Sequence, residues 1–249
     1  EKRNAGTFAL CPGIDRVLCY DRPQELWTAL RSGYDVVIDS EQWHHLSAIV
    51  ARMIRSKIKI GYGTNDRKRL FTQSIEYSHE NYEMDSFFEL LKPLEIEPPS
   101  TMLFPFLTVP AVDQLIADKG LGTLQGKPFV AMFPGASIAE RCWGVEKFHQ
   151  LAKRLIDEGV SVVVVGGKED IATGRAIADG LSVLNLTGKT SLCGTAGVLN
   201  RSQLLISGDS GVLHIGVGLG IPTVSLFGPG IAAKWAPRGK RNIVISHKL

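Results

Sequence analysis

The sequence predicts an α/β protein with two domains, each built around a parallel β-sheet that is covered by helices. In the second half of the 249-residue chain, short apolar runs alternate with segments whose apolar residues have helical spacing, which is typical of doubly wound parallel sheets. A proline-rich segment at 98–110 separates this half from a shorter first half with a similar pattern. At about 100–200 residues per domain, the length also favours two domains.

The first half contains two predicted strands. The strand at 34–39 holds a β-branched run, which indicates a strand buried on both faces. A helix follows at 46–54, where apolar residues recur at i, i+3, i+4, i+7 and i+8. A second strand is expected at 57–60 and a second amphipathic helix at about 84–94. No buried strand precedes residue 34, so we expect the first βα unit of this domain to be missing.

The second half repeats the βα pattern more strongly. The strand at 129–133 ends at a Pro-Gly pair, and the helix at 145–156 is closed by Gly159. An almost unbroken valine run at 160–165 ends at two glycines. Further strands are expected at 183–186, 204–207 and 223–227, with helices at 171–180, 192–200 and 211–219.

The composition excludes several classes of protein. With 44% hydrophobic and 21% charged residues, the chain is globular rather than disordered. No apolar run approaches the roughly 18–20 residues that span a bilayer. The four cysteines are scattered without a C-x-x-C motif, so we expect neither disulfides nor a metal site, and a cytoplasmic location. A net charge of +3 is too small to indicate nucleic acid.

Three of the predicted strands end in candidate ligand-binding residues, and the first two of these strand ends are suited to binding an anion. After the strand at 129–133, Gly135 permits close backbone approach, Ser137 offers a hydroxyl and Arg141 adds positive charge. The alternative is an ordinary strand-to-helix turn with a surface arginine. After the strand at 204–207, Asp209 or Ser210 can cap the next helix, whose N-terminus favours phosphate.

Two further residues extend this second cluster. Gly211 permits close backbone approach, and His214 lies about one turn into the helix, where it could face the same ligand. The alternative is an N-cap with a core histidine, but the position of the whole cluster at a strand end favours a ligand. The third strand end leads into 226–230, a Gly- and Pro-rich loop that is either pre-shaped for a ligand or a structural turn.

Two other motifs are incomplete. Residues 188–190 resemble the end of a phosphate-binding P-loop, but position 183 is valine where that loop needs glycine. The glycines at 216–220 precede a strand instead of following one, which is the wrong order for a dinucleotide fingerprint. The sequence therefore disfavours a P-loop NTPase and a standard NAD enzyme.

The first half contributes charged candidates. Arg55, Lys57 and Lys59 belong to a basic stretch at 52–69, which also includes Arg67 and could hold a phosphorylated or carboxylated acceptor or an anionic membrane surface. A solvated helix face is the alternative. Candidates for acid/base chemistry lie at and after the end of the strand at 34–39. They are Asp39, Glu41, His44 and His45.

Taken together, these motifs resemble glycosyltransferase family 9, the ADP-heptose:lipopolysaccharide heptosyltransferases. Residues 133–151 are similar to the family pattern P-G-A-S…K-R-W…F-x-x-L. Residues 208–229 are similar to G-D-[ST]-G-x-x-H…G-x-P-x-[VI]…[FY]-G-P. The similarity covers about 128–240 and is weaker in the first half, at 34–39 and 58–62.

The resemblance implies a GT-B fold, in which two Rossmann-like domains face each other across a cleft. Residues 1–108 would then be the acceptor-binding domain, and 109–249 the nucleotide-sugar-binding domain. The implied activity is inverting, metal-independent transfer of a heptose from an ADP-sugar, by default ADP-heptose, to a lipopolysaccharide-core or lipid A acceptor. It implies no cofactor, a monomer, and a cytoplasmic protein in peripheral contact with the inner membrane.

The resemblance also implies residue roles. Arg141 stands where the family has an active-site lysine, and Glu169 or Asp170 matches the acidic residue that binds the ribose hydroxyls. Cys142 and Gly230 depart from the family pattern and leave the identity of the donor open. The family's general base is an acidic residue near the start of the first domain, but nothing in 1–33 resembles it, so no base is assigned. The donor-binding residues would be Gly135, Ser137, Glu169, Asp209, Ser210, Gly211 and His214.

Two alternatives to a glycosyltransferase stay open at this point. A nucleotide-sugar epimerase of similar two-domain build would alter the sugar nucleotide without an acceptor. A nucleotide-binding protein without turnover would bind ADP and release no product.

Overall fold

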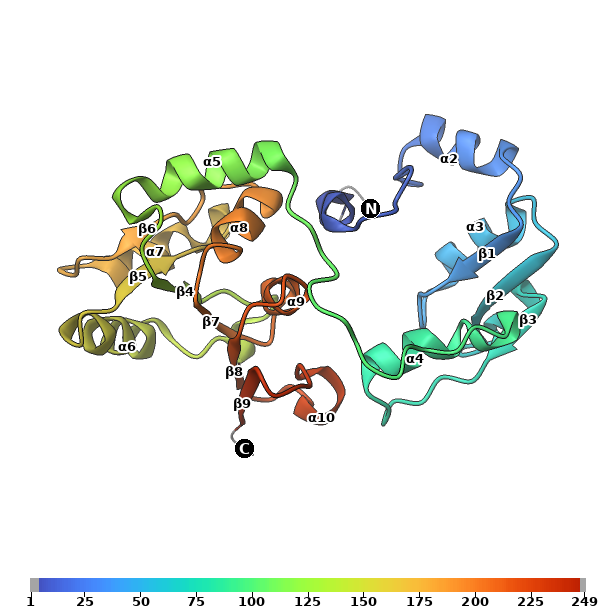
Figure 1. The fold of residues 1–249 in the computed structure, drawn as a ribbon. Helices are drawn as coiled ribbons and strands as arrows, with labels where there is room; N and C mark the ends of the chain where they lie inside the picture. The colour runs from blue at the N-terminus through green and yellow to red at the C-terminus, as the bar shows by residue number, and fades with distance from the viewer. Residues whose placement is uncertain (1–4, 247–249) are drawn as a thin grey trace. The chain divides into compact units, whose positions relative to one another are not determined.

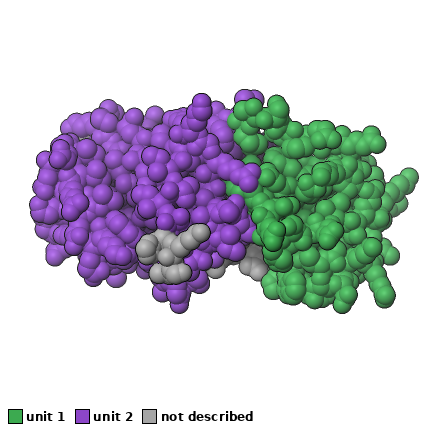
Figure 2. All heavy atoms as spheres, turned by 90° about the horizontal axis from the view of Figure 1, so that it is seen from below, with its two compact units in different colours: residues 1–5, 16–102 green, residues 6–15, 103–249 purple. Residues whose placement is uncertain are grey.

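The computed structural model describes residues 5–246 of the chain, which form two compact units. Unit 1 contains residues 5 and 16–102, and unit 2 contains residues 6–15 and 103–246 (Figure 2). The predicted division at 108/109 is therefore moved to 102/103, and 6–15 changes unit. The reason is that Leu10 and Leu107 both pack into the core of unit 2, and the backbone N–H of Thr108 donates to Leu10 O at 2.8 Å.

Unit 1 holds a three-stranded parallel sheet in the order β1-β2-β3 (Figure 1). Its core forms around Ile60, Tyr62, Tyr77 and Leu90. The helix predicted at 84–94 ends early, because Pro93 lies in a separate 3₁₀ helix at Lys92–Leu94. The elements of unit 1 are α2 (Pro23–Arg31), β1 (Val36–Asp39), α3 (His45–Met53), β2 (Ile58–Tyr62), a 3₁₀ helix (Arg67–Leu70), β3 (Gln73–Ile75) and α4 (Glu83–Glu89).

Unit 2 holds a six-stranded sheet in the order β6-β5-β4-β7-β8-β9, and every pair is parallel. The five predicted strands are confirmed to within two residues at each end, and β9 is an additional edge strand that the sequence pattern did not indicate. The strands are β4 (Phe129–Phe133), β5 (Ser161–Val164), β6 (Leu184–Asn185), β7 (Leu204–Gly208), β8 (Thr223–Phe227) and β9 (Asn242–Ser246).

Helices cover both faces of this sheet, as Figure 1 shows. The side chains of β4 alternate between two cores: Ala131 packs with α5, α8 and α9, whereas Met132 packs with α6 and α7. The helices are α5 (Ala111–Leu121), α6 (Val145–Asp157), α7 (Ile171–Ala178), α8 (Leu192–Leu199), α9 (Gly211–Gly218) and α10 (Ala232–Trp235). No helix in the described part of the chain is long and apolar enough to cross a membrane.

The strand order of unit 2 reverses direction between β4 and β7. From β4 the chain builds outward through β5 and β6, then returns to the other side of β4 and builds outward through β7, β8 and β9. The loops after β4 and β7 therefore leave the sheet in opposite directions. Such a switch point opens a crevice beyond the carboxyl ends of the strands, where ligands of open α/β sheets bind.

Candidate functional site

The loops that follow β4, β7 and β8 converge at this switch point. The backbone oxygen of Arg141 lies 3.2 Å from where a Cβ on Gly208 would stand, and the oxygen of Glu140 lies 3.6 Å from the same position on Gly228. The 3₁₀ helix Ala139–Arg141 thus passes over the ends of β7 and β8. All three strand ends that the sequence indicated belong to one site.

An arginine and an aspartate form the charged centre of this site. Arg141 Nη1 lies 3.2 Å from Asp209 Oδ2, and Asp209 is only 6% exposed. This carboxylate oxygen accepts no hydrogen bond within the described part of the chain. A Cβ on Gly230 would stand 2.7 Å from Asp209 Oδ2, so the loop after β8 approaches the carboxylate as closely as only glycine allows.

The N-terminus of α9 is capped by a serine side chain and still leaves space for a ligand. Ser210, rather than Asp209, is the cap: its Oγ accepts from Leu213 N at 3.2 Å and shares a 2.9 Å hydrogen bond with Ser207 Oγ. A side chain at Gly211 would meet no atom within 4 Å. The positive end of the helix dipole therefore faces a space that a phosphate can enter.

His214 is exposed and does not belong to the core, which excludes the core-histidine alternative. The protein around the ring nevertheless desolvates it and lowers its pKa, while the negative charge of Asp209 acts in the opposite direction. A neutral imidazole beside the open end of α9 can both donate and accept a hydrogen bond.

The cap on α9 leads to a stability prediction. We expect Ser210→Ala to lower the free energy of unfolding by about 1 kcal/mol, because the N–H of Leu213 loses its acceptor. Denaturant unfolding of both proteins measures the difference. Ser182→Ala, at an exposed position of the same unit, is the control and should change little. Equal losses in the two variants would show that the cap contributes nothing specific.

The two acidic residues after β5 have different environments. Asp170 is buried: its Oδ2 accepts from Gly167 N at 2.8 Å, and its Oδ1 lies 2.5 Å from where a Cβ on Gly135 would stand. Glu169 is exposed, and its carboxylate lies over the backbone of Gly167. Of the two candidates, Glu169 is therefore accessible to a ligand, whereas Asp170 is buried where the loop after β5 approaches Gly135 of the loop after β4. Ser137 is exposed in that second loop.

Burial raises the pKa of Asp170, with the charge of Glu169 adding to the effect and the N–H of Gly167 opposing it. A carboxyl whose pKa is raised by folding stabilises the protein below its unfolded pKa, and that stability is lost as the pH rises through the folded pKa. Asp170→Asn should therefore gain stability relative to the original chain as the pH rises above the ordinary pKa of an aspartate, about 4. Thermal unfolding at several pH values measures this, and a constant difference would contradict it.

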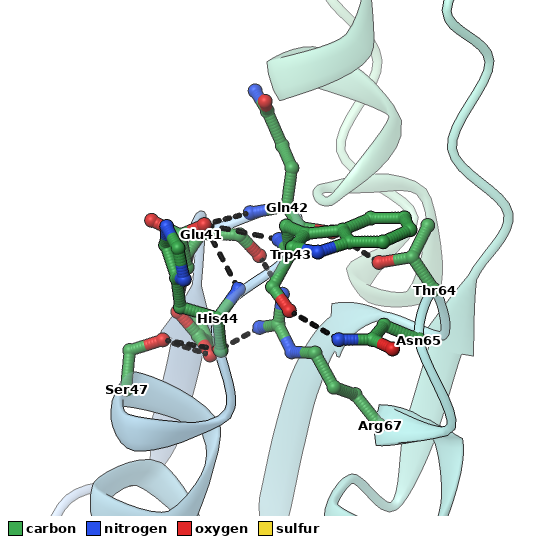
Figure 3. Close-up of polar contacts among 9 residues, drawn as sticks. Glu41, Gln42, Trp43, His44, Ser47, Thr64, Asn65 and Arg67 are labelled. Carbon is green, nitrogen blue, oxygen red and sulfur yellow. Dashed lines mark hydrogen bonds and ion pairs between the residues drawn. The ribbon is translucent and has the colours of Figure 1, made fainter.

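Unit 1 has its own cluster at the carboxyl end of its sheet (Figure 3). Arg67 is completely buried, and its Nη2 lies 2.6 Å from Asp39 Oδ2 at the end of β1. Its Nη1 donates to the backbone oxygen of Glu41. Asp39 also accepts from Ser47 Oγ at 3.0 Å and from Glu41 N at 3.0 Å. The loop after β1 is thus held to the sheet by a buried ion pair.

Other side chains hold the rest of this loop. Figure 3 shows Thr64 and Asn65 reaching toward it, and they donate to the backbone oxygens of Gln42 and Trp43. Glu41 Oε1 accepts from three backbone N–H groups, those of residues 42–44, at 2.9–3.2 Å. Partial burial acts to raise the pKa of Glu41, but these donors and the nearby His44 outweigh it and lower the pKa.

A pocket of about 420 Å³ opens beside this loop, lined by Asp39, Ser40, Glu41, Gln42 and residues from three other segments. The sequence indicated Asp39 and Glu41 here. It did not single out Arg67, whose place in a basic run suggested an exposed charge, or Gln42, which donates to the buried Glu83. His44 and His45 are exposed at the start of α3 and do not line the pocket.

The basic residues predicted for acceptor binding lie elsewhere. Lys59 is buried, and its Nζ donates to the carbonyl oxygens of Arg52 and Ile54 at the C-terminal end of α3, while burial lowers its pKa. Its ammonium thus caps the end of a helix and is not presented at the surface, where the prediction placed it. Arg55 and Lys57 are exposed, but they precede β2 and therefore lie at the opposite end of the strands from Asp39. The four residues of β1 separate the two ends by about 10 Å.

Within residues 5–246, no group of three or more His, Cys, Asp or Glu side chains is placed to hold a metal ion. The charged groups of both sites are instead matched with one another, as Arg141 with Asp209 and Arg67 with Asp39.

Two curated proteins of Escherichia coli are similar in sequence. Lipopolysaccharide heptosyltransferase 3 is 27% identical over 218 residues, which is 82% of this chain and 62% of that protein. Lipopolysaccharide heptosyltransferase 2 is 29% identical over 138 residues, or 53% of this chain and 40% of that protein. The chain thus covers less than two thirds of either relative.

Solved structures share the fold. The E. coli ADP-heptose lipopolysaccharide heptosyltransferase II aligns with a TM-score of 0.83 and 22% identity over 97% of this chain and 78% of that one. The E. coli heptosyltransferase WaaC with ADP aligns with a TM-score of 0.81 and 19% identity, over 100% of this chain and 82% of that one. The two parallel-sheet units are those of a GT-B fold.

The family assignment agrees with the residues that make up the strand-end site. The sequence model of glycosyltransferase family 9 (heptosyltransferase) matches residues 24–249, which include all of the loops that converge beside Arg141 and Asp209. The chain therefore belongs to glycosyltransferase family 9, the heptosyltransferase family.

Proposed function

We propose that this protein is an inverting, metal-independent glycosyltransferase that moves a heptose from ADP-heptose to a sugar of a lipopolysaccharide core. The observation that carries the proposal is the convergence of three strand-end loops around Arg141, Asp209 and the open N-terminus of α9. The names of the two curated relatives, both lipopolysaccharide heptosyltransferases, support the choice of donor and acceptor.

The proposed chemistry uses positive charge from the chain itself. As the bond between heptose and ADP breaks, negative charge develops on the leaving diphosphate. The helix dipole of α9 and the guanidinium of Arg141 stabilise that charge, and Asp209 holds the guanidinium in place. An arginine presents its donors in a planar fork, which suits two phosphate oxygens better than the single point charge of a lysine.

The other donor contacts follow from position. Ser137 and Gly135 belong to the loop after β4 and would meet the diphosphate, with Ser210 and Gly211 at the start of α9. Glu169 is the exposed carboxylate after β5 and would accept hydrogen bonds from the ribose hydroxyls. His214 would face the donor sugar beside Asp209. Unit 1 would bind the acceptor, and no cofactor besides the donor takes part.

Product analysis tests the proposal. The protein is incubated with ADP-heptose and a truncated core oligosaccharide, and the products are identified by mass spectrometry and by the anomeric couplings in NMR spectra. We expect an oligosaccharide larger by one heptose, inverted at the anomeric carbon, at the same rate with and without EDTA. An altered sugar nucleotide without acceptor would indicate an epimerase. ADP binding without product from any acceptor would indicate a binding protein.

A further inference from the structure

The pocket of unit 1 has a chemistry different from that expected of an anion site. Its polar lining consists of Asp39, Ser40, Glu41, Gln42 and Ser47, and its other two lining residues are Tyr20 and Phe87. None of these described lining residues is basic. The volume of about 420 Å³ lies within the roughly 300–1,000 Å³ of small-molecule sites.

We propose that this pocket binds an uncharged sugar unit of the acceptor through its hydroxyls and discriminates against acidic sugars. The proposal rests on the proposed glycosyl transfer and names the acceptor class of the same enzyme. Hydroxyl groups are donors that carboxylate, amide and hydroxyl oxygens accept. A carboxylate or phosphate on the ligand would instead face the negative charge of Glu41, and no basic side chain among the described residues lines the pocket; the nearby His44 lies outside the lining.

The charge of the pocket is set by how its acids are paired. The charge of Asp39 is neutralised by its ion pair with Arg67, which is completely buried and does not line the pocket. Glu41 has no basic side chain as a hydrogen-bond partner in the described structure. Its Oε1 accepts from three backbone N–H groups, which keeps the carboxylate ionised and its Oε2 available to a ligand.

The polar groups are held rigidly, as selective recognition requires. The side-chain amide of Gln42 donates to Glu83, whose other oxygen accepts from Tyr77 Oη at 2.9 Å. That bond fixes the Gln42 amide so that its oxygen remains the acceptor. Arg67 and Thr64 hold the backbone of the same loop. The loop therefore loses little further conformational freedom when a sugar binds.

Aromatic side chains complete the pocket. Phe87 is on α4 and is 43% exposed, and Tyr20 precedes α2. A sugar ring has an apolar face of C–H groups as well as hydroxyls, and an aromatic side chain covers such a face. Carboxylate, amide and aromatic groups together therefore suit a sugar better than they suit a free anion.

Binding of two small probes to the 249-residue chain tests the proposal. The probes are a methyl heptoside, which is uncharged, and the methyl glycoside of a 3-deoxy-ulosonic acid, which carries a carboxylate. Backbone amide NMR shifts are followed during each titration. We expect the heptoside to shift the amides of 39–42 and 87 and to bind at least tenfold more tightly than the acid. Equal or tighter binding of the acid, or no shift at these amides, would overturn the proposal.

Two variants probe the mechanism. Glu41→Gln keeps an oxygen for the three backbone donors but removes the charge, so the preference against the acid should fall at least threefold. Phe87→Ala should weaken heptoside binding at least fivefold. The matched controls are Glu97→Gln and Trp27→Ala, at exposed positions of unit 1 outside the pocket. Variants that behave like their controls would contradict the proposal.

A separate titration with ADP, read at the amides of 208–214, keeps this test apart from the proposed function. If ADP binds and heptose is transferred while the pocket amides stay unmoved by the heptoside, the pocket assignment alone is wrong. If the heptoside binds in the pocket but no acceptor is ever glycosylated, the proposed transfer is wrong.

Discussion

Replacing Arg141 with alanine should lower kcat for heptose transfer by about 10²–10³-fold, the effect of removing one donor that stabilises transition-state charge. The side chain is partly exposed, so the variant should fold normally. KM for the donor should change less than kcat, because the charge on the diphosphate grows as the bond breaks. Arg141→Lys should recover part of the loss. Steady-state kinetics with ADP-heptose and a core acceptor measure these values.

The neighbouring Cys142→Ala is a matched control, since Cys142 is exposed beside Arg141 on the same loop. It should keep kcat within about twofold. Asp209→Asn completes a double-mutant cycle with Arg141→Ala: if Asp209 acts by holding the guanidinium, the two losses should not add. An Arg141→Ala variant with nearly unchanged kcat would remove the residue from the proposed mechanism.

Arg67→Ala should destabilise unit 1 by about 3–5 kcal/mol. The substitution leaves Asp39 buried without its counter-charge, and breaking a buried pair on one side costs this much. The backbone oxygen of Glu41 loses a donor as well. Because the two units need not unfold together, hydrogen exchange is the suitable measurement. Exchange should accelerate in β1 and β2 and stay unchanged in β4 of unit 2.

Arg69→Ala is the control for this substitution, because Arg69 is exposed in the same 3₁₀ helix. It should leave exchange in β1 and β2 as it was. Arg67→Lys should give an intermediate result, since lysine keeps the charge and loses the planar fork that reaches both Asp39 and Glu41. If Arg67→Ala exchanges like the original chain, the ion pair does not stabilise the loop.

The site in unit 2 could be predicted closely because its signals are local. Each strand is a short apolar run, and the polar residues that follow it must lie at the carboxyl edge of a parallel sheet. The loops of Gly135, Arg141 and Asp209 were located in this way, and the structure brings them together. The order of the strands, which makes the ends of β4 and β7 neighbours, is not visible in any one segment.

The sequence could not predict which of two neighbouring residues would be buried or which would cap a helix. Asp170 is buried against Gly135 and Gly166, which belong to two different strand ends, whereas Glu169 is exposed. Similarly, Ser210 rather than Asp209 caps α9, with Ser207 of β7 beside it. A sequence pattern places both members of each pair at the same strand end and has no means of distinguishing them.

The sequence by itself determined the fold class, the family and the strand ends that carry the proposed donor site, because apolar periodicity and motif spacing depend on residues close together in the chain. Only the tertiary structure decided which charges are accessible. Lys59 and Arg67 look alike in the sequence as members of one basic run, yet one caps α3 and the other neutralises Asp39. Burial and ion pairing depend on contacts between segments that are distant in the chain, and these contacts exist only once the sheet has formed.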